Sequence, residues 1–192
     1  MVLSGAAALA LFVPLAIWAH DFAAAAWELD LVDLVHLQPN LAGDVVVGIN
    51  TLGNPVNWIV LLAGLAVAVG FLRGIRAGVF VGATYLVDVV VSLAKDYVQR
   101  GRPDTDATRL LFGVDSYGFP SAHTARAAAL AGALVWVFVP VRWRLPGAIV
   151  SAVVGGLVMA YARVALGVHF PTDTLGALLL GICWFALTAA FV

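Results

Sequence analysis

The chain has 192 residues, of which 63% are hydrophobic and 11% are charged, whereas a soluble domain is about 45–50% apolar and about 25% charged. This composition disfavours a soluble globular enzyme. Ten Lys and Arg residues against eleven Asp and Glu residues leave no excess positive charge to neutralise phosphates, so we expect no nucleic-acid partner.

Six long apolar runs predict six transmembrane helices, because each span needs roughly 20 apolar residues. The first run has no Lys or Arg before it, so it is interpreted as a retained helix and not as a signal peptide. We therefore expect an all-α, six-transmembrane-helix bundle that forms one integral membrane domain over residues 1–192. The predicted spans lie near residues 2–19, 55–72, 77–94, 122–141, 146–163 and 173–192.

The segment between the first two spans, residues 20–54, is too long for a simple turn. It contains WELDLVDLVHLQ, in which apolar residues alternate with acids. This pattern predicts a short amphipathic helix at the membrane surface, in the first extracytoplasmic loop. The stretch GINTLGNP follows it and predicts a loop leading into the second span.

Arginines in two short connections indicate the orientation. Arg73 and Arg76 lie between the second and third spans, and Arg142 and Arg144 lie between the fourth and fifth. The positive-inside rule places these connections in the cytoplasm. Because the number of spans is even, both termini are then cytoplasmic, and the segments 20–54, 95–121 and 164–172 are extracytoplasmic.

Three polar stretches interrupt the apolar pattern at that extracytoplasmic face: KDYVQRGRP from Lys95, FPSAHTAR from Phe119, and ARVALGVHFPTD from Ala162. Such residues are costly to hold near a bilayer without a function. Together they predict a cluster of Lys95, Arg102 and Arg163, which would repel one another unless an anion lay among them. A phosphoryl group suits these side chains.

The second stretch adds groups that suit the same anion. Pro120 can begin a helix, which would direct the Ser121 side chain and the N–H groups of Ala122 and His123 towards a phosphate. The alternative is that the cations extend to the lipid headgroups and pair with acids. We favour this alternative for Arg100, Arg109 and Arg126, with Asp96, Asp104 and Asp106 as their partners.

Two of the four histidines, His123 and His169, lie in the cationic stretches. Asp173 follows His169 by four residues, so its carboxylate can bond one ring nitrogen and leave the other as a nucleophile. His123 would protonate the leaving oxygen as a general acid. A competing arrangement uses His123, His169 and Asp173 as metal ligands. We do not favour it, because three cations would lie beside the metal, and we predict no metal or other cofactor.

Asp88 lies on the same face of the third span as Ser92 and Lys95, at helical positions i, i+4 and i+7. It would either tune Lys95 or contact a substrate headgroup, as a secondary site residue. Alternatively, it bonds a polar group of a neighbouring helix. The sequence does not choose between these roles.

At these residues the chain resembles the type 2 phosphatidic acid phosphatase superfamily, whose signature has the three parts KxxxxxxRP, PSGH and SRxxxxxHxxxD. The first part matches fully from Lys95 to Pro103. The second has Ala122 in place of glycine, and the third has Ala162 in place of serine. The resemblance covers about residues 50–192, with the order and spacing of all three parts kept.

The resemblance implies a metal-independent lipid phosphate or pyrophosphate phosphatase that acts through a phosphohistidine at His169. Asp173 would orient His169, His123 would serve the leaving group and then water, and Lys95, Arg102, Ser121, Ala122 and Arg163 would bind the phosphoryl group. The expected partner is a lipid phosphate from the bilayer, with polyprenyl pyrophosphate favoured over a phospholipid phosphate. Alternatives are a phosphotransferase to a lipid or sugar, a non-catalytic lipid-phosphate binder or transporter, and, disfavoured by composition, a soluble haloperoxidase.

Overall fold

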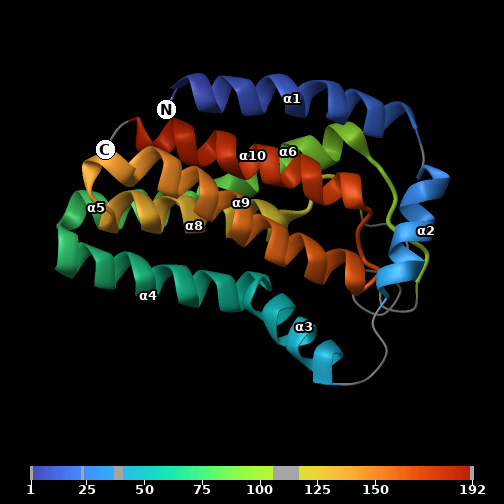
Figure 1. The fold of residues 1–192 in the computed structure, drawn as a ribbon, viewed down its shortest axis with the longest axis horizontal. Helices are drawn as coiled ribbons and strands as arrows, with labels where there is room; N and C mark the ends of the chain where they lie inside the picture. Colours follow the sequence, from blue (N-terminus) through green and yellow to red (C-terminus); the bar gives the residue numbers. More distant parts are fainter. Residues whose placement is uncertain (1, 23, 37–40, 106–116, 191–192) are drawn as a thin grey trace.

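The computed structural model describes residues 2–22, 24–36, 41–105 and 117–190, and the regular elements in these ranges are all helical. The predicted all-α architecture is therefore confirmed. Figure 1 shows the helices, and their bounds in chain order are α1 (Val2–Asp21), α2 (Ala26–Val35), α3 (Leu41–Leu52), α4 (Pro55–Arg73), α5 (Ile75–Ala83), the 3-10 turn η1 (Thr84–Leu86), α6 (Val87–Val98), α8 (Ala122–Phe138), α9 (Val141–Ala165) and α10 (Pro171–Ala189).

Five of the six predicted spans are long and apolar enough to cross a membrane: α1, α4, α9, α10 and the stretch Ile75–Val98 that joins α5, η1 and α6. The predicted fourth span is shorter than expected, because α8 has 17 residues and ends at Phe138. Val139 is extended, as expected for a residue that precedes a proline. Helix α9 then begins at Val141, so Arg142 and Arg144 lie in its first turn and not in the connection.

Helix α10 forms the centre of the bundle and contacts α1, α8 and α9 (Figure 1). Its apolar window is 67% buried, whereas that of α4 is 17% buried. Close packing requires a glycine in α10, since a Cβ at Gly181 would lie 2.6 Å from the carbonyl oxygen of Ala125 in α8. The central helix thereby presents its first turn, at Pro171, in a fixed place at one end of the bundle.

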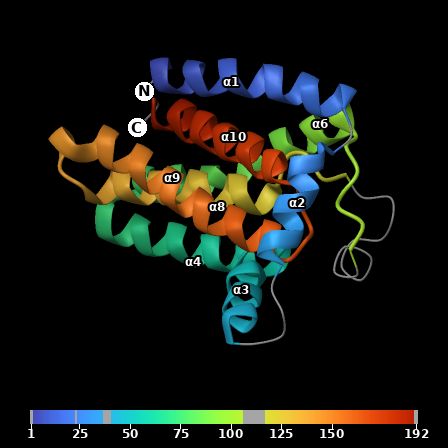
Figure 2. The ribbon, with the colours of Figure 1, turned by 45° about the vertical axis from the view of Figure 1, so that its right-hand side comes forward.

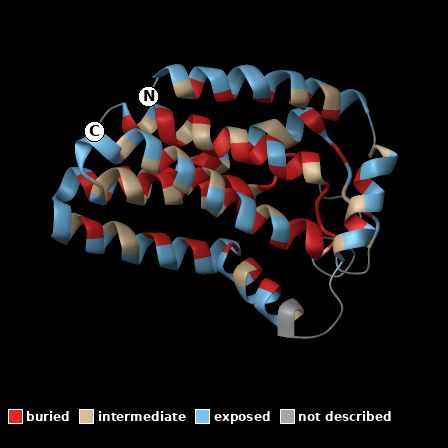
Figure 3. Cartoon of the chain, viewed as in Figure 1, coloured by how far each residue is buried: buried red, intermediate tan, exposed pale blue. Residues whose placement is uncertain are grey.

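The peripheral helices α1 and α4 are exposed along much of their length (Figure 3), and many of their exposed residues are large and apolar. Leu3 is 85% exposed, Val60 is 69% exposed and Phe71 is 89% exposed. A contiguous apolar exterior of this kind is the surface that lipid chains cover in a membrane protein.

Helices α4 and α5 form a tight hairpin around Gly74, which has a φ of 95°. A Cβ at Gly78 would lie 2.6 Å from the carbonyl oxygen of Ala66 in α4. A glycine at position 78 is therefore required for α5 to pack this closely against α4.

The segment between α1 and α4 contains two helices where the sequence predicted one. The predicted amphipathic helix is α2, which buries Glu28 and Val32 and crosses the ends of α9 and α10 (Figure 2). The predicted GINTLGNP loop is wrong for its first part, because GINTL belongs to α3. The reason is tertiary packing, because Val46 and Asn50, which lie about one helical turn apart on the same face of α3, are both buried.

Candidate active site

A cavity of about 460 Å³ opens at the end of the bundle where α6 ends and α8 and α10 begin. The three polar stretches identified in the sequence meet there, although they come from different helices. The cavity is lined by Asn50, Asn54, Pro55, Lys95, Arg102, Ala122, His123, Arg126, Arg163 and His169.

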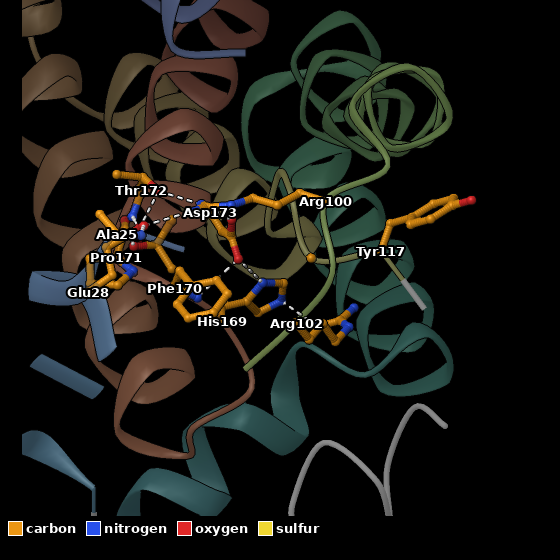
Figure 4. A network of polar contacts seen from close by, with 12 residues as sticks. Ala25, Glu28, Arg100, Arg102, Tyr117, His169, Phe170, Pro171, Thr172 and Asp173 are labelled. Carbon is orange, nitrogen blue, oxygen red and sulfur yellow. Dashed lines mark hydrogen bonds and ion pairs between the residues drawn. The ribbon is translucent and has the colours of Figure 1, made fainter. Parts of the chain in front are cut away.

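His169 and Asp173 form the contact that their spacing predicted. Nδ1 of His169 lies 3.3 Å from Oδ2 of Asp173, and the backbone N–H of Phe170 donates to the same oxygen at 3.0 Å (Figure 4). Pro171 is the first residue of α10, so Asp173 lies in the first turn and its carboxylate points back over the helix start. The pair is almost completely buried, with side chains 2% and 0% exposed.

The second nitrogen of His169 faces a guanidinium. Nη1 of Arg102 lies 2.9 Å from Nε2 of His169 and also donates to the carbonyl oxygen of Val168 at 3.0 Å. Because Arg102 can only donate, Nε2 is the unprotonated nitrogen and Nδ1 carries the proton towards Asp173. This arrangement gives His169 a defined tautomer.

Burial lowers the pKa of His169 well below its usual value of 6.5, and the nearby charges of Arg102, Arg163 and Lys95 lower it further. His169 is therefore a neutral imidazole at neutral pH, which is the form that can act as a nucleophile. Burial also lowers the pKa of the Arg102 guanidinium to about 10, so Arg102 stays charged.

The other two predicted cations line the same cavity. Arg163 is 1% exposed and donates to Oδ1 of Asn50 in α3. Lys95 donates to the carbonyl oxygens of Tyr117 at 2.7 Å and Gly118 at 3.2 Å, so it also holds the loop before α8. The three basic residues that the sequence predicted to cluster, Lys95, Arg102 and Arg163, therefore line one cavity, together with Arg126.

His123 lies in the first turn of α8, where Ala122 also lines the cavity. Nε2 of His123 is buried and has no hydrogen-bond partner within the described part of the chain. Ser121, also predicted to bind phosphate, is fully buried and does not line the cavity. Its hydroxyl accepts from Thr124 at 3.3 Å, and its N–H donates to the carbonyl oxygen of Asp173 at 3.1 Å.

The prediction that Arg100 and Arg126 extend to the lipid headgroups is wrong. Neither extends to lipid headgroups, because both are buried in ion pairs, at 5% and 7% exposure. Arg100 pairs with Glu28 and Asp173, and Arg126 pairs through two hydrogen bonds of 2.8 Å with Asp88. Local sequence cannot reveal these partners, since they lie on other helices. Arg109 and Asp106 lie outside the described residues.

Asp88 takes the second of its two predicted roles, bonding a polar group of a neighbouring helix. Its carboxylate holds Arg126, which also donates to the carbonyl oxygen of Gly53 at 2.6 Å. Arg126 lines the cavity, so Asp88 contributes to the site through it.

Asn50 and Asn54 also line the cavity, although the sequence pattern does not predict them as site residues. Both belong to GINTLGNP, whose composition is typical of a turn. In the described ranges, no three His, Cys, Asp or Glu side chains group as metal ligands, so His123, His169 and Asp173 do not form the alternative ligand set.

Comparisons with known proteins agree with this geometry. The family model described as the PAP2 superfamily matches residues 74–192, a range that contains all three polar stretches. Phosphatidylglycerophosphatase B of Bacillus subtilis (strain 168) is 29% identical over 157 residues, which make up 77% of this chain and 74% of that protein.

Two solved structures have a similar fold. A transmembrane PAP2-type phosphatidylglycerolphosphate phosphatase from Bacillus subtilis matches with a TM-score of 0.80 and 25% identity, over 98% of this chain and 95% of that one. Aquifex aeolicus LpxE matches with a TM-score of 0.65 and 24% identity, over 88% of this chain and 96% of that one.

Proposed function

Because this chain belongs to the PAP2 superfamily, we propose that it is an integral membrane phosphatase that removes a phosphoryl group from a lipid phosphate or pyrophosphate. The observation that carries the proposal is the buried His169–Asp173 pair at a cavity that Lys95, Arg102 and Arg163 also line. A neutral, oriented imidazole among fixed cations suits nucleophilic attack on an anionic phosphorus centre.

In the first step, Nε2 of His169 attacks phosphorus, and the bond between phosphorus and the leaving oxygen breaks. The imidazole acquires a positive charge, which the Asp173 carboxylate stabilises through Nδ1–H. In the free enzyme the Arg102 guanidinium donates a hydrogen bond to Nε2 of His169. Before the attack, this guanidinium must therefore leave Nε2 and bond the phosphoryl oxygens instead. Arg102 would then neutralise the charge of the transferring group together with Lys95 and Arg163.

His123 serves the leaving group in this proposal. Its ring lines the cavity, and its buried Nε2 has no partner within the described ranges. The charge of a bound phosphate favours the protonated imidazole, which then donates its proton to the departing oxygen. In the second step His123 takes a proton from water, which attacks the phosphohistidine and releases inorganic phosphate. No step in this sequence uses a metal ion.

Two apolar cavities support a lipid substrate. The first has a volume of about 390 Å³ and begins at Ile59, about one helical turn beyond Pro55, which lines the cationic cavity. The second has a volume of about 520 Å³ and continues along α4 to Phe71. Ala66 and Gly82 line both. A hydrocarbon chain placed along α4 would leave its phosphate at His169. The two candidate substrates are phosphatidylglycerol phosphate, because of the named relatives, and polyprenyl pyrophosphate.

We also propose that the site faces the outside of the cell and that both termini are cytoplasmic. The connection of α4 to α5 and the start of α9 lie near the two termini in Figure 1, at the end of the bundle opposite the start of α10. These helix ends contain Arg73, Arg76, Arg142 and Arg144. The positive-inside rule supports this orientation, and the apolar exterior supports a multi-pass location.

The test is a substrate panel with the purified protein in detergent containing EDTA. We expect release of inorganic phosphate from phosphatidylglycerol phosphate, polyprenyl pyrophosphate or phosphatidic acid, and no release by His169→Ala. Undiminished activity of His169→Ala, or a strict requirement for added metal, would contradict the mechanism. Transfer to an added lipid or sugar acceptor without phosphate release would identify a transferase, and binding without turnover would identify a carrier.

A further inference from the structure

A buried ion network lies behind the His169–Asp173 pair, on the side away from the cavity, and includes a residue of helix α2 (Figure 4). We propose that Arg100 is a positioning residue for this pair and that Glu28 holds Arg100 in place, so that α2 is a working part of the active site. This inference rests on the proposed phosphatase function.

Arg100 joins three segments of the chain at one guanidinium. Nη1 donates to Oδ1 of Asp173 at 2.9 Å and to the hydroxyl of Thr172 at 2.6 Å, and Nη2 donates to Oε2 of Glu28 at 2.5 Å. The guanidinium also lies over the rings of Phe170, 4.9 Å from the centroid, and Trp18, 5.2 Å from the centroid. The planar head is therefore fixed from several directions.

The two oxygens of Asp173 have separate partners. Oδ2 faces Nδ1 of His169 and the N–H of Phe170, whereas Oδ1 accepts from Arg100. Since both oxygens are held, the carboxylate cannot rotate away from the imidazole. A buried charge that loses its partner is strongly destabilised, so Arg100 also stabilises the charged form of Asp173.

Glu28 completes the network from α2. Oε1 accepts from the hydroxyl of Thr172 at 2.5 Å, and Oε2 accepts from the N–H of Ala25 at 3.0 Å as well as from Arg100. Burial opposes the charged form of Glu28, but the bonds from Thr172, Ala25 and Arg100 outweigh it and lower its pKa. Glu28 is thus a carboxylate that is 0% exposed.

The balance of charge gives Glu28 a role in the chemistry. One guanidinium is shared by two carboxylates, so the three groups together keep one negative charge. That charge is available to the imidazolium that forms when His169 attacks phosphorus. Without the Glu28 carboxylate, Arg100 would neutralise Asp173 alone and the imidazolium would be less stable.

The test compares Glu28→Gln and Arg100→Lys with Asp30→Asn, which makes the same carboxylate-to-amide change as Glu28→Gln at an exposed position of α2. We expect Glu28→Gln and Arg100→Lys to lower kcat by about ten-fold or more, the scale on which groups that orient a functional residue act. The KM should stay within about two-fold, because neither side chain lines the cavity. Asp30→Asn should behave as the unmodified enzyme.

A spectroscopic measurement separates positioning from a merely structural role. In the proton spectrum of ¹⁵N-histidine-labelled protein, the Nδ1–H resonance of His169 should lie far downfield because of its contact with Asp173, and it should move upfield in both variants. An unchanged Nδ1–H resonance, or a kcat of Glu28→Gln equal to that of Asp30→Asn, would overturn the inference. If Arg100→Lys does not fold, Glu28→Gln alone decides. If the unmodified protein cleaves no lipid phosphate, the proposed function fails, and the Nδ1–H comparison still decides this inference.

Discussion

At the scale of single residues, the protonation of His169 is controlled from both sides of its ring. Asp173 receives the proton of Nδ1, and Arg102 donates to Nε2. The spacing of His169 and Asp173 in the sequence predicts the first contact, because four residues across a helix start bring the side chains together. The second contact depends on how the chain after α6 folds over the start of α10, which no local pattern encodes.

The lowered pKa of His169 predicts that the folded enzyme keeps this imidazole neutral when the pH falls from 7.5 to 5. The unfolded chain, in contrast, takes up a proton near the ordinary pKa of about 6.5. The contribution of His169 to the free energy of unfolding is therefore full above that pH and decreases below it. A pH titration of the ¹⁵N-histidine spectrum checks this, and a midpoint near 6.5 for His169 would contradict it.

At the scale of elements, two helices and one junction support His123. Asp88 in α6 holds Arg126 in α8, and Arg126 donates to the carbonyl oxygen of Gly53 at the junction of α3 and α4. The ring of His123 packs against Gly53, where an added Cβ would overlap with Cδ2 of the ring. The junction thus sets one wall of the cavity next to the proposed general acid.

We therefore expect Gly53→Ala to displace His123 and to lower kcat by up to about 100-fold, since a shift of about 1 Å in a catalytic group can cost that much. The matched control is Gly48→Ala in α3, where an added Cβ meets no atom within 4 Å. Phosphate release measured at saturating substrate compares the two. Equal activity of both variants would show that Gly53 does not determine the position of His123.

At the scale of the whole molecule, the sequence predicted the features that depend on local pattern. The apolar runs indicated the long helices, and the three polar stretches indicated the cavity, because their chemistry is too costly in a bilayer to be incidental. The predicted helix bounds differ from the observed ones where a proline ends a helix, as at Pro140, which follows the end of α8. The sequence pattern does not predict α3, because its asparagine is typical of a turn.

The pairing of buried charges could not be predicted in the same way. Glu28 and Arg100 are 72 residues apart in the chain, and Asp88 and Arg126 are 38 apart. Taken alone, each of these charged residues would be expected at the membrane surface, in contact with water or headgroups. Only the packing of α2 across the ends of α9 and α10, and of α6 beside α8, turns them into buried ion pairs.

The central claim is that His169 carries the phosphoryl group between the lipid and water. Rapid acid-free quenching of the enzyme during turnover of a ³²P-labelled lipid phosphate, followed by peptide mapping, tests it most directly. The account predicts a base-stable, acid-labile label on His169 that is absent from His169→Ala. Steady turnover with no label on the protein, or with the label on another residue, would contradict it.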